Sequence, residues 1–148
     1  MENTLVLIKP DAVSRGLVGE ITGRLERKGL QLVACRMTYA TLELLREHYR
    51  EHADKDYFPQ IVSSMTAGPL VAQVWRGQDA VAVVRTLMGA TDPRKATPGT
   101  IRGDLGLHVG RNLCHGSDGI VSADREIGLW FYNLCERTDS LYDLKYMD

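Results

Sequence analysis

Residues 110–118, GRNLCHGSD, combine a histidine with small and polar neighbours in a pattern that permits chemistry. Neutral imidazole is abundant near neutral pH, so His115 is a competent nucleophile if a carboxylate orients its ring. Glu126 lies eleven residues further on, inside a predicted helix, from which it can turn back toward His115. A single histidine is more often structural or exposed, so this stretch alone leaves a nucleophile and a loop-closing residue as alternatives. Cys114 has no base of its own to activate it, and we interpret it as a buried bystander.

Basic and hydroxyl side chains gather around a segment rich in Gly, Pro and Thr over residues 90–110. Guanidinium forks and a hydroxyl suit the oxygens of a polyphosphate. Singly, each is more often a surface arginine or a turn threonine. Their concentration around one segment is informative because the net charge of the chain is only −1. The candidates are Arg85, Thr91, Arg94, Lys95, Arg102 and Arg111.

Lys9 closes an apolar run and is followed by Pro10 and Asp11. An ammonium in this place can point at a phosphate or a ribose, although such a lysine more commonly leaves the core for water. Tyr49 and Phe58 are the candidates for exposed aromatic rings that stack a base, and core packing is the commoner alternative for both.

His48 and His52 are spaced as i and i+4 and superficially invite a zinc interpretation. The metalloprotease motif, however, needs Glu where Tyr49 stands, and no third ligand accompanies the pair. We therefore predict that the two histidines lie on a solvated helix face and that the protein holds no metal of its own. The sequence also has no G-x-x-x-x-G-K-[ST] loop, and no G-x-G-x-x-G follows a strand.

The composition narrows the class of protein. With 148 residues, 44% of them hydrophobic, the chain fits one domain over residues 1–148. A near-neutral charge argues against a general nucleic-acid binder. Cys35, Cys114 and Cys135 have an unpatterned spacing that favours reduced thiols. With no apolar leader and no apolar run long enough for a bilayer, we expect a cytoplasmic protein without membrane contact.

Apolar patterning predicts the elements that must position these residues. Short apolar runs predict strands over 4–9, 30–40, 69–77 and 113–115. Helical spacing predicts helices over 17–29, 42–52, 57–68, 80–89 and 122–131. Thr41 and Asp79 are the expected N-caps of two of these helices. Residues 90–110 have weak periodicity and are expected to form a long functional loop ending near His115.

This order of elements is β-α-β-β-α-β with additions. It predicts an α/β (α+β) protein with a ferredoxin-like βαββαβ sandwich, in which helices pack on one face of a four-stranded antiparallel sheet.

Three segments resemble the nucleoside diphosphate kinase family: TLVLIKPDAVSRGLVGEI, GATDP…TPGTIRGDLG and GRNLCHGSD…SADREIGLWF. The last contains N-x-x-H-G-S-D, which is specific to that family, and the likeness runs from Thr4 to Phe131. The resemblance implies ping-pong transfer of a γ-phosphoryl group, through a phosphohistidine on His115, from a nucleoside triphosphate to a nucleoside diphosphate. It implies broad use of ATP, GTP, CTP, UTP and their deoxy forms, since every base has a π face for an aromatic plate.

The resemblance also assigns site residues. Glu126 orients His115, and Ser117 ties the two together. The remaining assignments are phosphate contacts from Arg85, Thr91 and Arg102, sugar contacts from Lys9 and Asn112, base stacking on Phe58, and Tyr49 beside the phosphates. Mg²⁺ is expected to arrive on the nucleotide because no carboxylate cluster marks a metal cage, and Asp118 is expected to touch it only through water.

The chain departs from the family pattern after Phe131, so residues 132–148 are expected to form a divergent C-terminal tail. In the family this tail packs on a neighbouring subunit, so a homo-oligomer is expected, with hexamer, tetramer and dimer left open. Two other functions compete with the kinase: a non-catalytic relative that only binds nucleotides, and a histidine phosphocarrier that passes phosphate to a protein. The chemically competent residues at every matched position disfavour the first, and Lys9, Asn112 and Phe58 would lack a purpose in the second.

Overall fold

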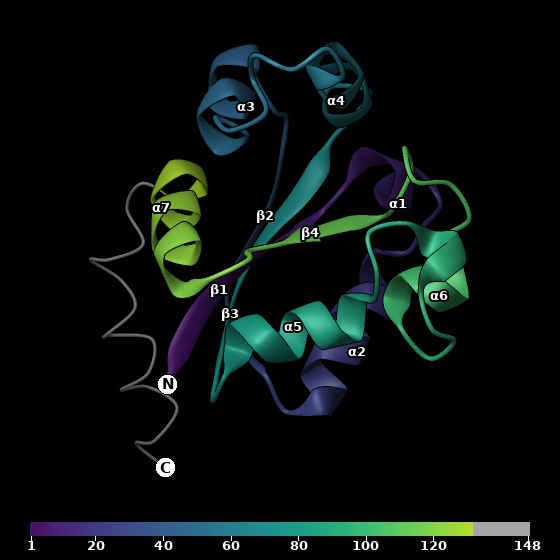
Figure 1. Ribbon diagram of the computed structural model, residues 1–148. Coiled ribbons are helices and arrows are strands. Elements are labelled where there is room, and N and C mark those ends of the chain that lie inside the picture. The colour runs from purple at the N-terminus through teal and green to yellow at the C-terminus, as the bar shows by residue number, and fades with distance from the viewer. Residues whose placement is uncertain (132–148) are drawn as a thin grey trace.

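The computed structural model describes residues 1–131 (Figure 1). The strands are β1 (Glu2–Ile8), β2 (Gln31–Thr38), β3 (Leu70–Gly77) and β4 (Cys114–Gly116). The helices are α1 (Pro10–Ser14), α2 (Val18–Lys28), α3 (Leu42–His48), α4 (Phe58–Met65), α5 (Ala80–Met88), α6 (Ile101–Leu105) and α7 (Ile120–Trp130), with a short 3-10 turn η1 (Pro93–Lys95). The predicted tail and Cys135 lie outside the described residues.

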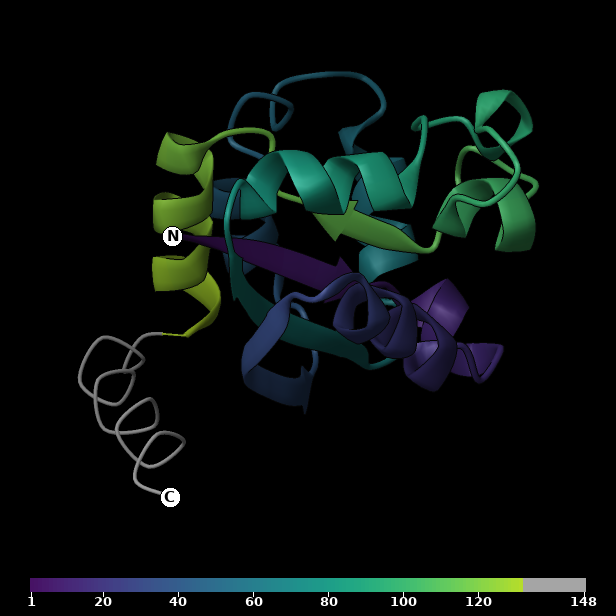
Figure 2. The same cartoon turned by 90° about the horizontal axis from the view of Figure 1, so that it is seen from below.

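The four strands form one sheet in the order β2-β3-β1-β4, and each pair of neighbours is antiparallel. This confirms the ferredoxin-like α/β prediction. The expectation that helices cover one face is wrong. Seen from below, the sheet lies between α2 and α5 in front and α3 and α4 behind (Figure 2).

The central strand β1 explains the two helix layers. Its side chains alternate between faces: Val6 and Ile8 join the core beneath α2 and α5, whereas Leu5 and Leu7 join the core beneath α3, α4 and α7. A strand covered on both faces is a continuous apolar run, while a strand with one solvated face alternates polar and apolar residues. The run LVLI in β1 is of the first kind.

The segment over residues 90–110 is more regular than predicted, since it contains η1 and α6. Thr100 is the N-cap of α6, and its Oγ1 accepts a hydrogen bond from the backbone N–H of Gly103 at 3.0 Å. The carboxylate of Asp104 stabilises the segment by accepting hydrogen bonds from Gly99 N–H at 2.8 Å and from Arg24 at 2.7 Å. Both elements are too short to leave a periodic signal in the sequence.

The two predicted helix caps differ in outcome. Thr41 caps α3, because its Oγ1 accepts from Leu44 N–H at 3.1 Å. Asp79 stands at the N-cap of α5 but makes no side-chain cap bond, and its φ of 51° is left-handed. The carboxylate of Glu2 supplies the missing acceptor, taking the N–H of Val81 at 3.2 Å.

Within residues 1–131 no helix has the length and apolarity needed to cross a bilayer. Cys35 is exposed and Cys114 is buried, and both are free thiols. Burial raises the pKa of the Cys114 thiol, which agrees with its interpretation as a bystander.

Candidate active site

His115 occupies the middle of β4, where it pairs with Leu7 on the central strand. The residue two positions before it, Leu113, is buried with a left-handed φ of 75°. This sparsely populated conformation is held on both sides: Leu113 N–H donates to Asp11 Oδ2 at 3.1 Å, and its carbonyl accepts from Lys9 N–H at 2.8 Å. Strained residues persist where the surroundings over-determine them, and here they fix the start of the strand that carries His115.

Glu126 on α7 contacts the ring of His115: His115 Nε2 is hydrogen-bonded to Glu126 Oε1. The carboxylate is only 3% exposed. Ser117 lies beside it, fully buried, and donates a hydrogen bond to Glu126 while its own N–H binds Leu5 O at 3.2 Å. Because Nε2 faces Glu126, the nitrogen free to react is Nδ1.

A second group of predicted residues surrounds Asn112. Lys9 Nζ donates to Asn112 Oδ1 at 2.7 Å, and Asn112 Nδ2 donates to the carbonyl of Thr91 at 3.2 Å. Arg102 is buried and donates from Nε to Asn112 O at 3.0 Å, from Nη1 to Gly89 O at 3.0 Å and from Nη2 to Cys114 O at 2.7 Å. These bonds leave about two of the five guanidinium N–H groups for a ligand.

Burial and the nearby cations keep His115 neutral. Burial, followed by the charges of Lys9, Arg102 and Arg85, lowers the pKa of His115 to about 3, against a smaller opposing effect of Asp118. Burial, followed by the charge of Arg102, lowers the pKa of Lys9 to about 8. Burial raises the pKa of Glu126. A neutral imidazole beside positive charge has a free lone pair and lies next to groups that attract phosphate.

A hollow of about 150 Å³ opens over His115 between α3, α5 and α7. It is lined by Tyr49, Arg85, His115, Asp118 and Glu126, together with His48, Glu51, His52, Gly116, Ser122 and Arg125. Burial raises the pKa of Tyr49, so its phenol stays protonated and can donate a hydrogen bond. The pKa of Asp118 is lowered, chiefly by a hydrogen bond from Ser122, so it stays ionised.

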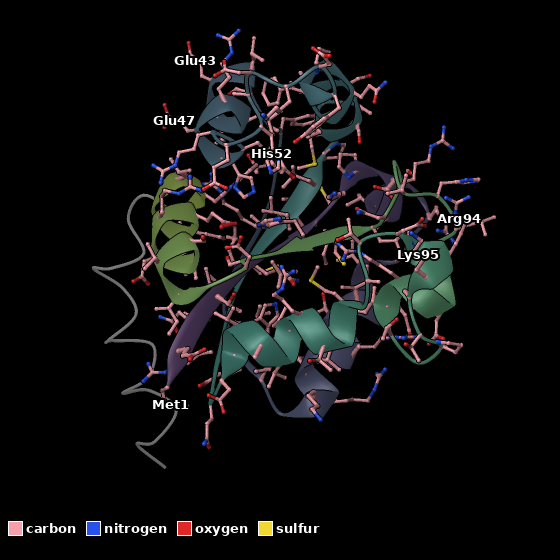
Figure 3. All side chains as sticks on the ribbon, viewed as in Figure 1. Met1, Glu43, Glu47, His52, Arg94 and Lys95 are labelled. Atoms are coloured by element: carbon pink, nitrogen blue, oxygen red, sulfur yellow. The ribbon has the colours of Figure 1, made fainter. Side chains whose placement is uncertain are left out.

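Not every basic residue around 90–110 reaches this hollow. Arg94 is exposed and pairs with Asp92, and the side chains of Arg94 and Lys95 point outward from the molecule (Figure 3). Arg111 lines a different hollow, between α1 and α6. The charge concentration therefore divides into site residues and surface residues.

The prediction that His48 lies on a solvated face is wrong. The helix α3 ends at His48 instead of continuing to residue 52, so the two histidines do not share a helix face. His48 is 4% exposed and its ring meets that of His115 edge-on, with centroids 4.5 Å apart. By contrast, Glu43 and Glu47 point outward from the same helix (Figure 3). The sequence does contain one signal that His48 lies in the site: it directly precedes Tyr49, which the family resemblance assigns to the site.

The prediction that Phe58 is an exposed plate for a base is also wrong. Phe58 is 6% exposed and packs in the core with Leu45 and Met65, because the inner face of α4 begins there. The neighbouring Tyr57 is 44% exposed. Its hydroxyl is hydrogen-bonded to His52 Nδ1, and His52 in turn lies edge-on to Tyr49 at 6.3 Å. A row of rings thus leads from His115 to Tyr57 at the surface.

The lowered pKa values of two histidines predict how the free energy of unfolding depends on pH. His48 and His115 have a pKa of about 3 in the folded protein, whereas the ordinary value for a histidine is 6.5. Between these values the unfolded chain binds more protons, so the free energy of unfolding rises with pH. We expect it to fall by up to about 1.4 kcal/mol per histidine for each pH unit below 6.5. The raised pKa of Glu126 has the opposite sign and lessens the slope at the acid end.

Urea unfolding at pH 7.5, 6.5 and 5.5 measures this slope. His48→Leu should flatten it, while His108→Gln, at an exposed position, should leave it unchanged. Equal stability at pH 5.5 and 7.5 in the wild-type protein would contradict the neutral state of both rings.

A neutral histidine oriented by a buried carboxylate and surrounded by cations is typical of enzymes that transfer an anionic group. The family model described as nucleoside diphosphate kinase matches residues 2–134. The chain belongs to this family, and its members are transferases.

Relatives are similar to this chain in sequence over most of its length. A nucleoside diphosphate kinase of Archaeoglobus fulgidus is 56% identical over 131 residues, which are 88% of this chain and 87% of that protein. One of Natronomonas pharaonis is 53% identical over 148 residues, covering 99% of this chain and 94% of that protein. Among solved structures, that of a halophilic nucleoside diphosphate kinase from Halobacterium salinarum in complex with CDP has a TM-score of 0.86 and 52% identity, covering 88% of this chain and 87% of its own.

Proposed function

We propose that this protein transfers the γ-phosphoryl group of a nucleoside triphosphate to a nucleoside diphosphate in two half-reactions through a phosphohistidine on His115. The observation that carries the proposal is the pairing of His115 Nε2 with the buried carboxylate of Glu126. This contact leaves the lone pair of Nδ1 directed at a ligand in the hollow.

The first half-reaction follows from this geometry. Nδ1 of His115 attacks the γ-phosphorus, the bond from that phosphorus to the bridging oxygen breaks, and the diphosphate leaves with the electron pair. The imidazole becomes positive while Nε2 keeps its proton, and Glu126 stabilises that charge. The second half-reaction is the reverse, with a terminal oxygen of another nucleoside diphosphate as the nucleophile.

The remaining side chains hold the nucleotide. Arg85 and the protonated phenol of Tyr49 line the hollow and are available to the phosphates. Arg102 and Thr91, which are both joined to Asn112, complete the phosphate contacts. Lys9 and Asn112, already paired with each other, bind the sugar hydroxyls. Phosphoryl transfer depends on such positioning and charge neutralisation more than on covalent help from the protein.

The donor set fits a magnesium ion that is carried by the nucleotide. Mg²⁺ prefers oxygen ligands, and in the hollow these are limited to carboxylates at its edge and the buried, histidine-bound Glu126. Among these carboxylates, the ionised side chain of Asp118 is the most suitable ligand for Mg²⁺, and it would contact the ion through a water molecule. When bound, Mg²⁺ neutralises phosphate charge.

We infer that Tyr57, not Phe58, is the plate on which the base stacks. Tyr57→Ala should weaken nucleotides of all bases alike by about 1–3 kcal/mol in binding free energy. Phe58→Ala should instead lower the free energy of unfolding by about 3–5 kcal/mol, because it empties part of the core. Calorimetric titration with ADP, GDP and CDP, beside urea unfolding, separates the two effects. A loss confined to one base would mean that base edges are read.

We also propose that the protein is a homo-oligomer that works in the cytoplasm. The edge strand β2 contains Met37 one residue before its end and is followed directly by Tyr39; these two residues are 60% and 68% exposed. An exposed apolar edge is suited to pairing with another chain. The free thiols of Cys35 and Cys114 fit a reducing compartment. Light scattering of the purified protein distinguishes dimer, tetramer and hexamer.

Initial rates test the two-step reaction. With Mg·ATP and GDP varied together, a phosphohistidine intermediate gives parallel double-reciprocal lines, because the first product leaves before the second substrate binds. Intersecting lines would show a ternary complex and contradict the proposal.

A further inference from the structure

His48 has a buried polar atom that the proposed reaction does not use. Its Nε2 is inaccessible to solvent and has no hydrogen-bond partner. An unsatisfied group inside a protein costs free energy, and such groups cluster where a catalytic role explains them. The nearest acidic atom is Glu126 Oε1 at 3.7 Å, the same oxygen that binds His115 Nε2.

Trp130 determines which nitrogen of His48 carries the proton. The indole Nε1–H donates to His48 Nδ1 at 3.0 Å. An indole N–H can only donate, so Nδ1 offers its lone pair and the proton of the neutral ring sits on Nε2. Burial above all lowers the pKa of His48 to about 3, so the ring is neutral at physiological pH. Nε2–H is therefore a donor that points toward Glu126.

The helix α7 also holds the backbone of His48. Arg125 donates to the carbonyl of Glu47 at 2.7 Å and to that of His48 at 3.2 Å, which satisfies free carbonyls at the C-terminal end of α3. The ring of His48 meets that of His115 at an interplanar angle of 73°. One helix thus supplies both Glu126 and the groups that fix the ring packed against His115.

We propose that His48 is a positioning residue for the phosphorylation of His115. As the imidazole of His115 gains positive charge, Glu126 settles between two donors, His115 Nε2–H and His48 Nε2–H. A shift of about 0.5 Å brings the 3.7 Å separation into hydrogen-bond range. His48 also forms the wall that sets the plane of the His115 ring. This inference rests on the proposed phosphorylation of His115.

The side chains of His48, His115 and Glu126 could also be interpreted as a metal site, but the tautomer of His48 argues against that interpretation. Ligand atoms of His48, His115 and Glu126 lie within 4.8 Å of one another. A metal ligand must offer a lone pair, but the lone pair of His48 Nδ1 accepts from Trp130 and its Nε2 carries the proton. The arrangement is suited to holding a carboxylate.

Two tryptophan variants make the matched test. Trp130→Phe keeps the ring but removes the donor that fixes His48. Trp75→Phe removes an equally buried indole N–H, which donates to Gln73 Oε1 at 3.0 Å in the other core. The readout is the single-turnover rate constant for phosphorylation of the protein by Mg·ATP. We expect Trp130→Phe to lower it about tenfold, as misplacement of reacting groups does, and Trp75→Phe to leave it within about twofold of wild type.

If the indole N–H of Trp130 had only a structural role, the two substitutions would change the rate constant to the same extent. Equal rate constants in the two variants would therefore overturn the inference. At the position of His48, Gln retains a donor near the place of Nε2, whereas Leu does not. His48→Gln should therefore retain a higher rate constant than His48→Leu, with the dissociation constant for Mg·ATP unchanged in both. Equal rates for Gln and Leu would overturn the inference as well.

Nitrogen-15 NMR of the unmodified protein gives a readout that needs no variant. We expect His48 to keep a bare Nδ1 and a protonated Nε2 from pH 5 to 8, and a proton on Nδ1 would overturn the proposal. Failure of the proposed function looks different: the wild-type protein itself would then take no phosphoryl group from Mg·ATP.

Discussion

We expect that replacing His115 with glutamine abolishes phosphoryl transfer while the protein still folds and binds Mg·ATP. Glutamine keeps a polar side chain of similar length but has no nucleophilic lone pair on nitrogen. Removal of a nucleophile is among the most damaging changes in an enzyme, and we expect kcat to fall at least about 10⁴-fold. A coupled assay of ADP formation measures turnover, and protection from thermal unfolding by Mg·ATP measures binding.

His108→Gln is the matched control for His115→Gln. His108 is exposed on the segment after α6 and does not line the hollow over β4. We expect its activity to stay within about twofold of wild type, as is usual for surface substitutions away from special features. Substantial turnover in His115→Gln, above the level of a contaminant, would remove His115 as the nucleophile.

Arg102→Met should lower kcat/KM by about 10²- to 10³-fold. Arg102 supplies positive charge beside His115 and also joins three backbone carbonyls, those of Gly89, Asn112 and Cys114. The substitution therefore removes phosphate neutralisation and loosens the chain before β4. Steady-state kinetics measures the first effect, and the melting temperature measures the second.

Two controls separate charge from scaffolding at Arg102. Arg94→Met removes an exposed arginine of the same region and should leave kcat/KM unchanged within about twofold. Arg102→Lys retains the charge, but one ammonium cannot replace a planar guanidinium that reaches three carbonyls. Its kcat/KM should lie between those of wild type and Arg102→Met. An unchanged kcat/KM in Arg102→Met would exclude Arg102 from the site.

The contact between His115 and Glu126 follows from the sequence because each residue stands in a short-range pattern. His115 lies in N-x-x-H-G-S-D, and Glu126 lies one helix further on, so local geometry brings them together. Lys9 and Asn112 are 103 positions apart, and only the family resemblance brought them to one site before the structure.

The predictions that are wrong also have local causes. Helical spacing does not show where a short helix ends, so His48 was placed with His52 although α3 stops at His48. At the start of α4 two adjacent rings differ in exposure, 6% for Phe58 and 44% for Tyr57, and the sequence does not show which of two neighbouring positions is buried. The run LVLI in β1 did carry the signal for helices on both faces of the sheet.

The most direct test of the account is transfer of label in two separated steps. The protein is incubated with γ-labelled ATP and Mg²⁺, freed of nucleotide, and then given unlabelled GDP. We expect an acid-labile label on His115 that moves to GTP, because in the proposed reaction the phosphoryl group rests on Nδ1 between the two half-reactions. A protein that takes no label, or a label that GDP does not remove, would contradict it.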